Sequence, residues 1–267
     1  SLLQNKAVIK LDLYQVDSFT NKLFEGNPAG VIFSSELSKN HMQKIALENN
    51  LSETAFVSQD ENGFNIKWFS PLMEIDLCGH ATLAAAHIYF SEINTSANKI
   101  SFNSNSGILN VYKEDTYLYL DFPADVMERL DIDDKLIEML GIKPIEAFKG
   151  RDDFMCIFKD ELSIKSIKPN FEILKTYPVR GLIVSAKSID YDFISRCFFP
   201  ITGVDEDPVT GSAHTSLTPY WSKVLNKDEL FAKQVSTRGG ELKCKLSGER
   251  VIIGGEAITY MKGSILI

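Results

Sequence analysis

Two stretches of this 267-residue chain share one layout, and they constrain its fold more than any other feature. The first, residues 73–90, reads MEIDLCGHATLAAAHIYF, and the second, residues 204–221, reads VDEDPVTGSAHTSLTPYW. Aligning Gly79 with Gly211 places His80 on Ser212, at an offset of 132 residues, about half the chain. Such a long period predicts two related halves rather than a solenoid of short repeats. Each half would carry one helix whose N-terminus faces a shared cleft.

The helix expected over residues 78–90 is apolar on nearly every side, and such a helix is buried on most sides. A sheet must therefore wrap around it. Alternating or short apolar runs bounded by turn residues predict the strands of that sheet and of a second one. These runs lie at residues 8–16, 31–33, 54–57, 64–69, 100–122, 154–158 and 181–185, with further short strands after residue 234.

Polar residues near the two expected helix starts indicate chemistry. Free backbone N–H groups and the helix dipole make a helix N-terminus a ready anion site. In the second stretch, Thr210, Gly211 and Ser212 stand where the helix is expected to begin, and the acidic residues 205–207 crowd the preceding turn. This combination suits a pocket that holds a carboxylate substrate and moves protons on it.

The composition excludes several other classes of protein. A net charge of −8 argues against a nucleic-acid surface and favours a cytoplasmic protein. The four cysteines form no CxxC pair, so neither a zinc site nor a disulfide framework is indicated. No apolar run approaches the roughly 18 residues of a membrane span, and no Gly-rich nucleotide-binding fingerprint is present.

Four motifs carry a specific resemblance. They are FEGNPAGV at residues 24–31, LSETAF at 51–56, DLCGHAT at 76–82 and DEDPVTGSAH at 205–214. In this order, and spread over almost the whole chain, they resemble the phenazine-biosynthesis isomerase (PhzF-like) family, which is related to diaminopimelate epimerase.

The resemblance implies an α+β fold of the diaminopimelate epimerase-like type. Two pseudo-symmetric halves would each fold a curled, mostly antiparallel sheet around a central helix, with the site in the cleft between them. The N-terminal half would span residues 1–121, completed by residues 257–267, and the C-terminal half residues 122–256. The resemblance also implies a biosynthetic, cofactor-independent isomerase that holds no metal, acts on a small carboxylate-bearing substrate and forms a homodimer.

Glu53 is the main catalytic candidate, because it stands at the mouth of a predicted strand, between Ser52 and Thr54. A carboxylate there can take a proton from carbon and return it, provided that partial shielding from water raises its proton affinity. The alternative is a solvated glutamate at a helix–strand junction. The resemblance favours catalysis, since this position matches the family's acid/base glutamate.

The resemblance adds His80, Ser212 and Asp207 as catalytic residues of the pocket. Near a positive helix end, the imidazole of His80 is expected to stay neutral. Ser212 would either cap its helix or donate to the substrate. Asp207 would either form a turn or bind an amino or hydroxyl group of the substrate and help to pass the proton. The backbone N–H groups of Gly79 and Gly211 would hold a carboxylate.

Cys78, Thr210 and Asn27 complete the expected substrate-binding set. In the related two-cysteine epimerases, one cysteine precedes the glycine of each helix start; Cys78 fits the first place, and Thr210 occupies the second. Simple racemisation has therefore lost one acid/base partner, and we expect Cys78 to be a small buried residue behind the pocket. Asn27 matches the family without an assignable chemistry.

Three functions stay open at this point. The first is an isomerase that moves a proton between carbons of a small amino or hydroxy acid. The second is an epimerase, or a lyase similar to the hydroxyproline dehydratases, that acts through Cys78. The third is a non-catalytic metabolite-binding protein on the same scaffold. None of these readings names a substrate.

Overall fold

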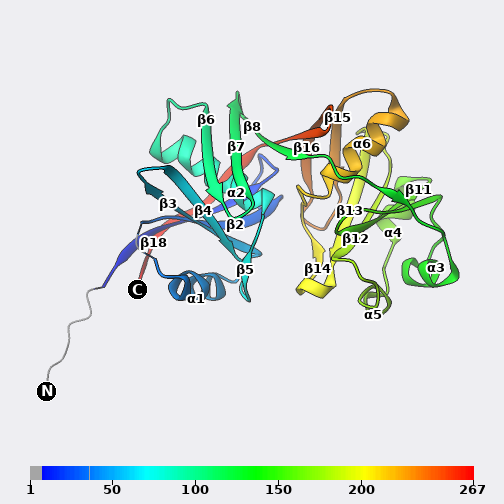
Figure 1. Cartoon of the computed structure of the whole chain (residues 1–267), viewed down its shortest axis with the longest axis horizontal. Helices are drawn as coiled ribbons and strands as arrows, with labels where there is room; N and C mark the ends of the chain where they lie inside the picture. The colour runs from blue at the N-terminus through cyan, green and yellow to red at the C-terminus, as the bar shows by residue number, and fades with distance from the viewer. Residues whose placement is uncertain (1–7, 36) are drawn as a thin grey trace, which may run out of the picture.

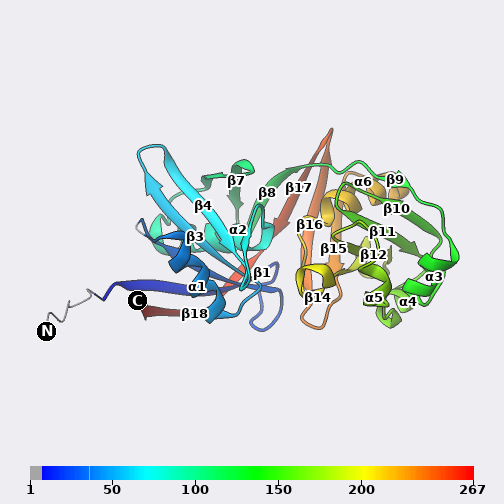
Figure 2. The same ribbon diagram turned by 60° about the horizontal axis from the view of Figure 1, so that its bottom comes forward.

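The computed structural model describes residues 8–35 and 37–267 as two halves that lie side by side (Figures 1 and 2). The first seven residues of the predicted N-terminal half lie outside the described residues. The N-terminal half contains β1 (Lys10–Ser18), β2 (Asn27–Phe33), α1 (Lys39–Asn49), β3 (Glu53–Asp60), β4 (Gly63–Phe69), β5 (Glu74–Ile75), α2 (Gly79–Ile88) with a π-helical turn (Tyr89–Ile93), β6 (Lys99–Ser104), β7 (Gly107–Glu114), β8 (Tyr117–Pro123) and β18 (Ala257–Leu266).

The C-terminal half holds the remaining elements. They are β9 (Glu128–Arg129), α3 (Asp134–Leu140), β10 (Glu146–Lys149), β11 (Asp153–Phe158), α4 (Glu161–Ser166), α5 (Phe171–Leu174), β12 (Gly181–Lys187), β13 (Phe193–Phe199), a 3₁₀ turn (Pro200–Thr202), β14 (Val204–Asp207), α6 (His214–Leu225), β15 (Glu229–Gln234), β16 (Gly240–Ser247) and β17 (Arg250–Gly255).

The two halves repeat one order of strand pairings. In the first, β1–β2 is antiparallel, β2–β3 parallel, β3–β4 antiparallel, β4–β6 parallel, and β6–β7–β8 antiparallel. In the second, β10–β11, β11–β12, β12–β13, β13–β15 and β15–β16–β17 follow the same sequence of directions. The expectation of two pseudo-symmetric, mostly antiparallel sheets is confirmed.

Two strands join the halves. β8 pairs with β17 along its length, and the chain then continues from β17 into β18, which returns to the first half and pairs with β1. Figure 1 shows this C-terminal segment, in red, crossing from one half to the other. The predicted division at residue 121 falls inside β8 and stays a prediction.

The central helices form the core because each is enclosed by its sheet. Every residue of α2 from His80 to Ala86 is buried, as the all-round apolar pattern predicts. α6 buries Leu217 and Trp221 in the second half. One cluster of buried side chains runs through both halves around these helices, while α1 covers the outer face of the first sheet and α3, α4 and α5 cover that of the second.

Local sequence signals explain several element ends. The side chain of Ser38 caps α1 by accepting from the His41 N–H. Gly141 ends α3 in the left-handed conformation with φ 71°, which glycine adopts without steric cost. In β8, buried and part-buried positions alternate along the strand, so that one face meets α2.

The predicted start of the second central helix is wrong by a few residues. α6 begins at His214, and the segment before it is a tight turn in which His214 and Thr215 donate backbone hydrogen bonds to Gly211 and Ser212, at 3.0 and 3.1 Å. These are bonds between residues three apart, the 3₁₀ spacing. Gly211 and Ser212 therefore lie in a helical lead-in rather than in α6 itself.

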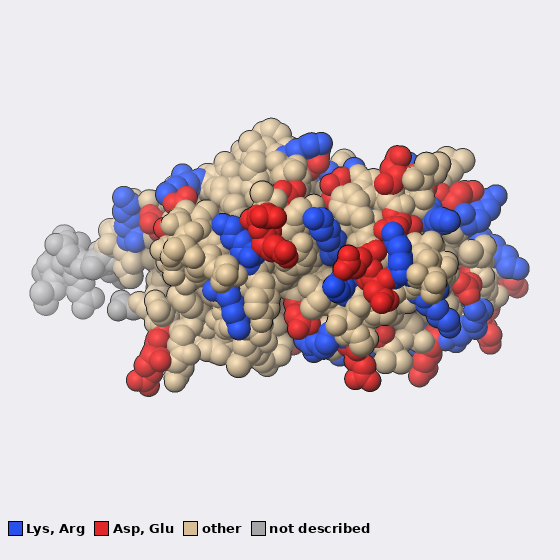
Figure 3. All heavy atoms as spheres, turned by 90° about the horizontal axis from the view of Figure 1, so that it is seen from above, with Lys and Arg blue, Asp and Glu red and all other residues tan. Residues whose placement is uncertain are grey.

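The surface mixes charges of both signs. On the face seen in Figure 3, Lys and Arg side chains lie among Asp and Glu side chains, and neither sign covers that face continuously. Across residues 8–35 and 37–267, no helix combines the length and the apolar character needed to cross a lipid bilayer.

Candidate active site

The starts of the two central helices meet at the junction of the halves. A Cβ atom added to Gly79 would lie 3.8 Å from the Cα of Gly211, and one added to Gly211 would lie 3.8 Å from the Cα of Gly79. The prediction that the two helix starts face each other is therefore confirmed. Because neither residue carries a side chain, the backbone N–H groups at the two starts stay uncovered at this point.

Glu53 and His80 face each other beside this meeting point. Glu53 is the first residue of β3, and His80 lies in the first turn of α2. The Glu53 Oε2 and His80 Nε2 atoms are 3.2 Å apart, and their side chains are 17% and 7% exposed. The contact lacks hydrogen-bond alignment, and both atoms are buried without a hydrogen-bond partner among the described residues. Ser18 helps to hold this turn, since its hydroxyl donates to the His80 carbonyl at 2.8 Å.

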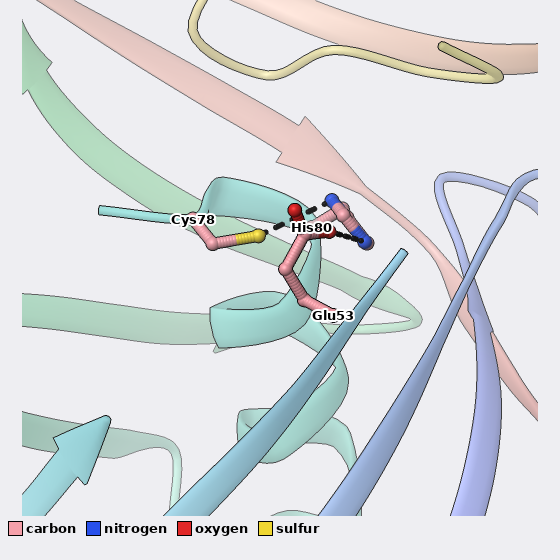
Figure 4. Close-up of side chains that lie close together, drawn as sticks. All are labelled: Glu53, Cys78 and His80. Carbon is pink, nitrogen blue, oxygen red and sulfur yellow. Dashed lines mark hydrogen bonds and ion pairs between the residues drawn. The ribbon is translucent and has the colours of Figure 1, made fainter. Parts of the chain in front are cut away.

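Cys78 contacts the opposite edge of the same imidazole. Its Sγ lies 3.4 Å from His80 Nδ1 (Figure 4). Burial lowers the pKa of His80. Cys78 and Glu53 raise it by a larger amount, so that the pKa of His80 lies well above its usual range. The prediction of a neutral imidazole is therefore wrong, because Cys78 and Glu53, which face the two ring nitrogens, outweigh burial and the helix end. Burial, and next Glu53, raise the pKa of the Cys78 thiol, while His80 lowers it.

These three side chains do not form a convincing metal site. One donor atom from each of Glu53, Cys78 and His80 lies within 4.8 Å of the others, and oxygen, sulfur and nitrogen donors are all acceptable to zinc. However, Sγ lies against Nδ1 and Oε2 lies against Nε2, on different edges of the ring. The three side chains therefore make two separate contacts on the imidazole ring, and their donor atoms do not converge on one metal position.

Asp207 lies at the end of β14 and receives donors from both halves. Asn27, fully buried at the start of β2, donates from Nδ2 to Asp207 Oδ1 at 3.0 Å and to the Val209 carbonyl at 2.9 Å. The Thr210 hydroxyl donates to Asp207 Oδ2. Burial raises the pKa of Asp207 above its usual range, although His80 and the hydrogen bond from Thr210 oppose the rise.

Ser212 is held from the second half. Its Oγ accepts from Arg180 Nη2 at 3.3 Å, and Arg180 in turn forms a two-pronged ion pair with the buried Asp153. Ser212 does not cap α6, whose N-cap residue is Ala213. Because its oxygen accepts from a guanidinium, the Ser212 hydroxyl can donate its own proton to another group.

The predicted residues thus gather in two linked groups. Glu53, His80 and Cys78 form the first, and Asn27, Asp207 and Thr210 form the second. The charges of His80 and Glu53 both act on Asp207, so the two groups share one electrostatic environment. Two surface hollows, of about 540 and 70 Å³, lie elsewhere, and none of these six residues lines either.

Sequence reasoning missed three supporting residues. Arg180, Asp153 and Gln234 each sit at the end of a strand or next to one, and no motif includes them. Asn27 was singled out without a role, and the structure supplies one, since Asn27 connects β2 to the acidic turn. A polar residue at the end of an otherwise apolar strand was the one available signal for Asp153, whereas Gln234 ends a strand that also contains Glu229 and Lys233 and so carried no such signal.

Proteins of known structure share this architecture. A crystal structure of a PhzF-family phenazine biosynthesis protein from Enterococcus faecalis matches with a TM-score of 0.94 at 45% identity, covering 97% of this chain and 100% of that one. A hydroxyproline epimerase from Agrobacterium vitis shares the fold alone, with a TM-score of 0.64 at 9% identity over 97% of this chain and 93% of that one. The fold is therefore of the diaminopimelate epimerase-like class.

The family is defined more narrowly by sequence. The profile of the phenazine biosynthesis-like protein family matches residues 16–263. An uncharacterized isomerase of Pseudomonas aeruginosa is 45% identical over 258 residues, which is 96% of this chain and 99% of that relative. The chain belongs to the phenazine biosynthesis-like (PhzF) family, and this membership supports an isomerase-like activity.

Proposed function

We propose that this protein is a cofactor-independent isomerase that moves a proton between two carbons of a small, carboxylate-bearing, unsaturated metabolite. Glu53 is the acid/base group. The observation that carries the proposal is the pair of buried atoms Glu53 Oε2 and His80 Nε2, which lie 3.2 Å apart without hydrogen-bond partners among the described residues. The two atoms attract each other as an ion pair, but neither makes an aligned hydrogen bond, so each keeps hydrogen-bonding capacity that a bound ligand can use.

The proposed reaction uses the backbone N–H groups at the junction of the halves, Glu53 and His80. The backbone N–H groups of Gly79, at the start of α2, and of Gly211, in the turn that leads into α6, hold the substrate carboxylate. A substrate C–H bond breaks and its proton bonds to Glu53 Oε2; the C–H electron pair forms a new double bond, and the electron pair of the neighbouring double bond moves to its far carbon. The far carbon then takes a proton either from Glu53 or from His80 Nε2, in which case Glu53 passes its proton to His80, and the double bond has shifted. Atoms and electrons balance without any further reactant.

The asymmetry of the two halves favours a single-base reaction. Glu53 opens β3, and the equivalent strand of the second half, β12, opens with Gly181. A side chain at Gly181 has no room, because its Cβ would lie 2.2 Å from the ring of Phe199. The second half therefore offers no carboxylate in the matching place, as a reaction with two opposed bases would need.

The Cys78-dependent alternative has less support. A thiol acts as a base or nucleophile only as the thiolate, and burial together with Glu53 raises the pKa of Cys78. The corresponding position of the second half, Thr210, has its hydroxyl committed to Asp207. Cys78 is better explained as the group that orients the His80 ring through Nδ1.

A screen for solvent exchange tests the proposal. Small unsaturated amino and hydroxy acids are incubated in heavy water with the protein, and deuterium uptake at carbon is followed by NMR. With a compound that exchanges, Glu53→Gln should lower the rate by about 10² to 10⁴, the usual contribution of a positioned acid/base group. Cys78→Ser, which keeps a polar atom beside His80 Nδ1, should retain most of the rate.

The controls separate the competing functions. Circular dichroism and acetate binding show whether Glu53→Gln is folded and still holds a carboxylate. A folded Glu53→Gln protein that exchanges at the parent rate contradicts the proposal. A Cys78→Ser protein that is folded but inactive would transfer the acid/base role to the thiol. Compounds that bind without exchanging would support a metabolite-binding protein.

A further inference from the structure

Gln234 is a buried polar residue outside every motif. It is the last residue of β15, its exposure is 0%, and its side chain makes three hydrogen bonds to one turn. Oε1 accepts from the Thr210 backbone N–H at 2.8 Å. Nε2 donates to the Asp207 carbonyl at 2.8 Å and to Thr210 Oγ1 at 3.1 Å. All of its bonds therefore end on the segment that carries Asp207.

The position of Gln234 follows from the sheet. β15 runs parallel to β13, with Gln234 opposite Ser195, and Cys197 of β13 lies opposite Asp207 of β14. β15 pairs with residues 193–195 of β13 and β14 with residues 197–199, so the end of β15 lies next to the end of β14 that carries Asp207. Gln234 is 27 residues from Asp207 in the sequence, but the sheet places their atoms within hydrogen-bond distance.

The direction of each hydrogen bond is fixed by the backbone. A backbone N–H can only donate and a backbone carbonyl can only accept. The Thr210 N–H therefore faces Oε1, and the Asp207 carbonyl faces Nε2. Nε2 has no lone pair to offer, so it must also donate to Thr210 Oγ1. The Thr210 hydroxyl then keeps its own proton free for Asp207 Oδ2.

A matching chain of donors reaches Asp207 from the first half. The Val209 carbonyl can only accept, so Asn27 presents Nδ2 both to it and to Asp207 Oδ1. Ser52, which precedes Glu53, donates to Asn27 Oδ1 at 3.4 Å. Both carboxylate oxygens of Asp207 thus receive a donor whose orientation is fixed elsewhere, and their remaining lone pairs can accept from a substrate N–H or O–H group.

We propose that Gln234 is a positioning residue of the active site: it directs the Thr210 hydroxyl toward Asp207 and so holds Asp207 as an oriented hydrogen-bond acceptor for the substrate. The role toward the substrate rests on the proposed function. The orientation of Thr210 and Asp207 does not, and it can be measured in the unliganded protein.

The test follows the carboxyl group of Asp207 directly. The protein is labelled with ¹³C at the aspartate side-chain carboxyls, the Asp207 resonance is assigned by its loss in Asp207→Asn, and its titration is recorded. The other polar or titratable groups that act on Asp207 are Asn27, Thr210, His80, Glu53 and Cys197, and all stay unchanged.

Gln234→Glu keeps the shape of the side chain but reverses its effect on Thr210. One carboxylate oxygen still accepts from the Thr210 N–H, while the other can no longer donate to the Asp207 carbonyl or to Thr210 Oγ1 and instead attracts the Thr210 hydroxyl proton away from Asp207. Losing a donor and gaining a like charge both favour protonated Asp207. The midpoint of the Asp207 titration should therefore rise by about one pH unit or more. Gln234→Leu, which only removes the bonds, should shift it in the same direction by less.

Gln43→Glu is the matched control. Gln43 lies on α1, and its Nε2 likewise donates to two backbone carbonyls, those of Ser70 and Pro71, at 2.9 and 3.1 Å. It makes no contact with Asp207 among the hydrogen bonds of the described chain, so the Asp207 titration should match that of the parent. A folded Gln234→Glu protein in which Asp207 titrates as in the parent overturns the proposal, and if Gln234→Leu does not fold, Gln234→Glu alone decides.

A kinetic readout adds the substrate. With any compound that exchanges, Gln234→Glu should lower the exchange rate and shift its pH profile by the amount found for Asp207, which a loss of stability alone would not do. A shifted titration with an unshifted pH profile would reject the role toward the substrate. If the parent protein catalyses no exchange, the proposed function fails while the carboxyl titration still decides whether Gln234 orients Asp207.

Discussion

At the scale of single residues, the site consists of groups whose partners are other groups of the site. His80 has Glu53 at one ring nitrogen and Cys78 at the other. Asp207 accepts from Asn27 and from Thr210. Each side chain is oriented before a ligand arrives, so little reorganisation is needed when charge moves on a substrate.

The ion pair of His80 predicts a pH-dependent stability. The folded-state pKa of His80 lies above its unfolded value of about 6.5. Its contribution is therefore fully present below about pH 6.5 and is lost as the pH rises through the folded-state pKa. We expect the free-energy difference between the parent and His80→Gln to be larger at about pH 6 than at about pH 8.5.

Urea unfolding at the two pH values measures this difference. His41→Gln is the control, because the His41 side chain is exposed on α1 and lacks an ion pair among the described residues. The control should follow the parent at both values. If the free energy of unfolding changes with pH by the same amount in the parent and in His80→Gln, His80 is not held as a cation in the folded protein.

At the scale of elements, the two central helices are equivalent in place but not in detail. α2 begins directly at Gly79, whereas a 3₁₀ turn at Gly211 leads into α6. The glycines nevertheless come together because neither has a side chain to separate the two backbones. The close approach of Gly79 and Gly211 thus depends on both residues being glycine, whereas the turn before α6 occurs only in the second half.

Adding a methyl group at either glycine should remove anion binding and spare the fold. In Gly79→Ala or Gly211→Ala, the new Cβ meets its nearest neighbour at 3.8 or 3.6 Å, an ordinary contact. We expect the free energy of unfolding to stay unchanged or to rise by up to about 1 kcal/mol, because alanine loses less chain entropy on folding. The stabilisation that sulfate or acetate gives the parent protein should disappear, since the methyl group occupies the space beside the N–H groups.

Thermal unfolding with and without the anion measures both effects. Gly255→Ala provides the contrast, because its Cβ would lie 2.3 Å from the ring of Phe19, which is too close for any real contact. That change should cost about 1 to 3 kcal/mol through overpacking. An equal loss of stability at Gly79 and at Gly255, or anion stabilisation that persists in Gly79→Ala, would argue against the helix starts as the anion site.

At the scale of the whole molecule, Arg238 connects a loop of the second half to the first half through hydrogen bonds. Arg238 donates from Nη2 to Asp17 Oδ1 at 2.8 Å and to the Glu25 carbonyl at 3.0 Å, and from Nε to the Gly26 carbonyl at 2.8 Å. The Asp17 side chain is 3% exposed, and its buried carboxylate is paired with Arg238 and accepts from the Phe24 N–H. This contact lies beside the β1–β2 loop that leads to Asn27, and it ties the relative position of the halves to the site.

Removing this contact should destabilise the protein by about 1 to 3 kcal/mol, the cost of leaving a buried acceptor unsatisfied. Burial raises the pKa of Asp17, while the Phe24 N–H and Arg238 lower it. Without Arg238 the raised pKa rises further, and a raised carboxyl pKa costs stability as the pH increases through it. The deficit of Arg238→Met should therefore be larger at about pH 8 than at about pH 4.5.

Urea unfolding of Arg238→Met, with Asp17→Asn/Arg238→Met as its partner, measures the effect. The double variant should recover part of the loss at high pH because no buried charge remains. Arg250→Met is the surface control: the Arg250–Asp121 pair is 48% and 38% exposed, and such pairs contribute less than about 1 kcal/mol. Equal losses of unfolding free energy for Arg238→Met and Arg250→Met would show that the contact between Arg238 and Asp17 has no special role.

The homodimer stays a prediction, which light scattering would test.

Signals carried by neighbouring residues were enough for much of the fold. The Ser38 cap and the Gly141 stop act within one turn of the chain, so the local sequence determines them. The all-round apolar character of α2 required an enclosing sheet, and the repeated layout at Gly79 and Gly211 required two halves that meet. The positions of Glu53 and His80 followed from the motifs of the family.

The tertiary structure alone decided how the site is completed. Gln234 reaches Asp207 because β14 and β15 both pair with β13, and Arg180 reaches Ser212 across 32 residues of chain. The charge of His80 was predicted wrongly because it depends on the orientation of Cys78 against the ring and on a carboxylate that β3 brings to within 3.2 Å. Local sequence can determine propensities and caps, which act over a few residues, but hydrogen bonds and charges act through space between segments that only the folded chain brings together.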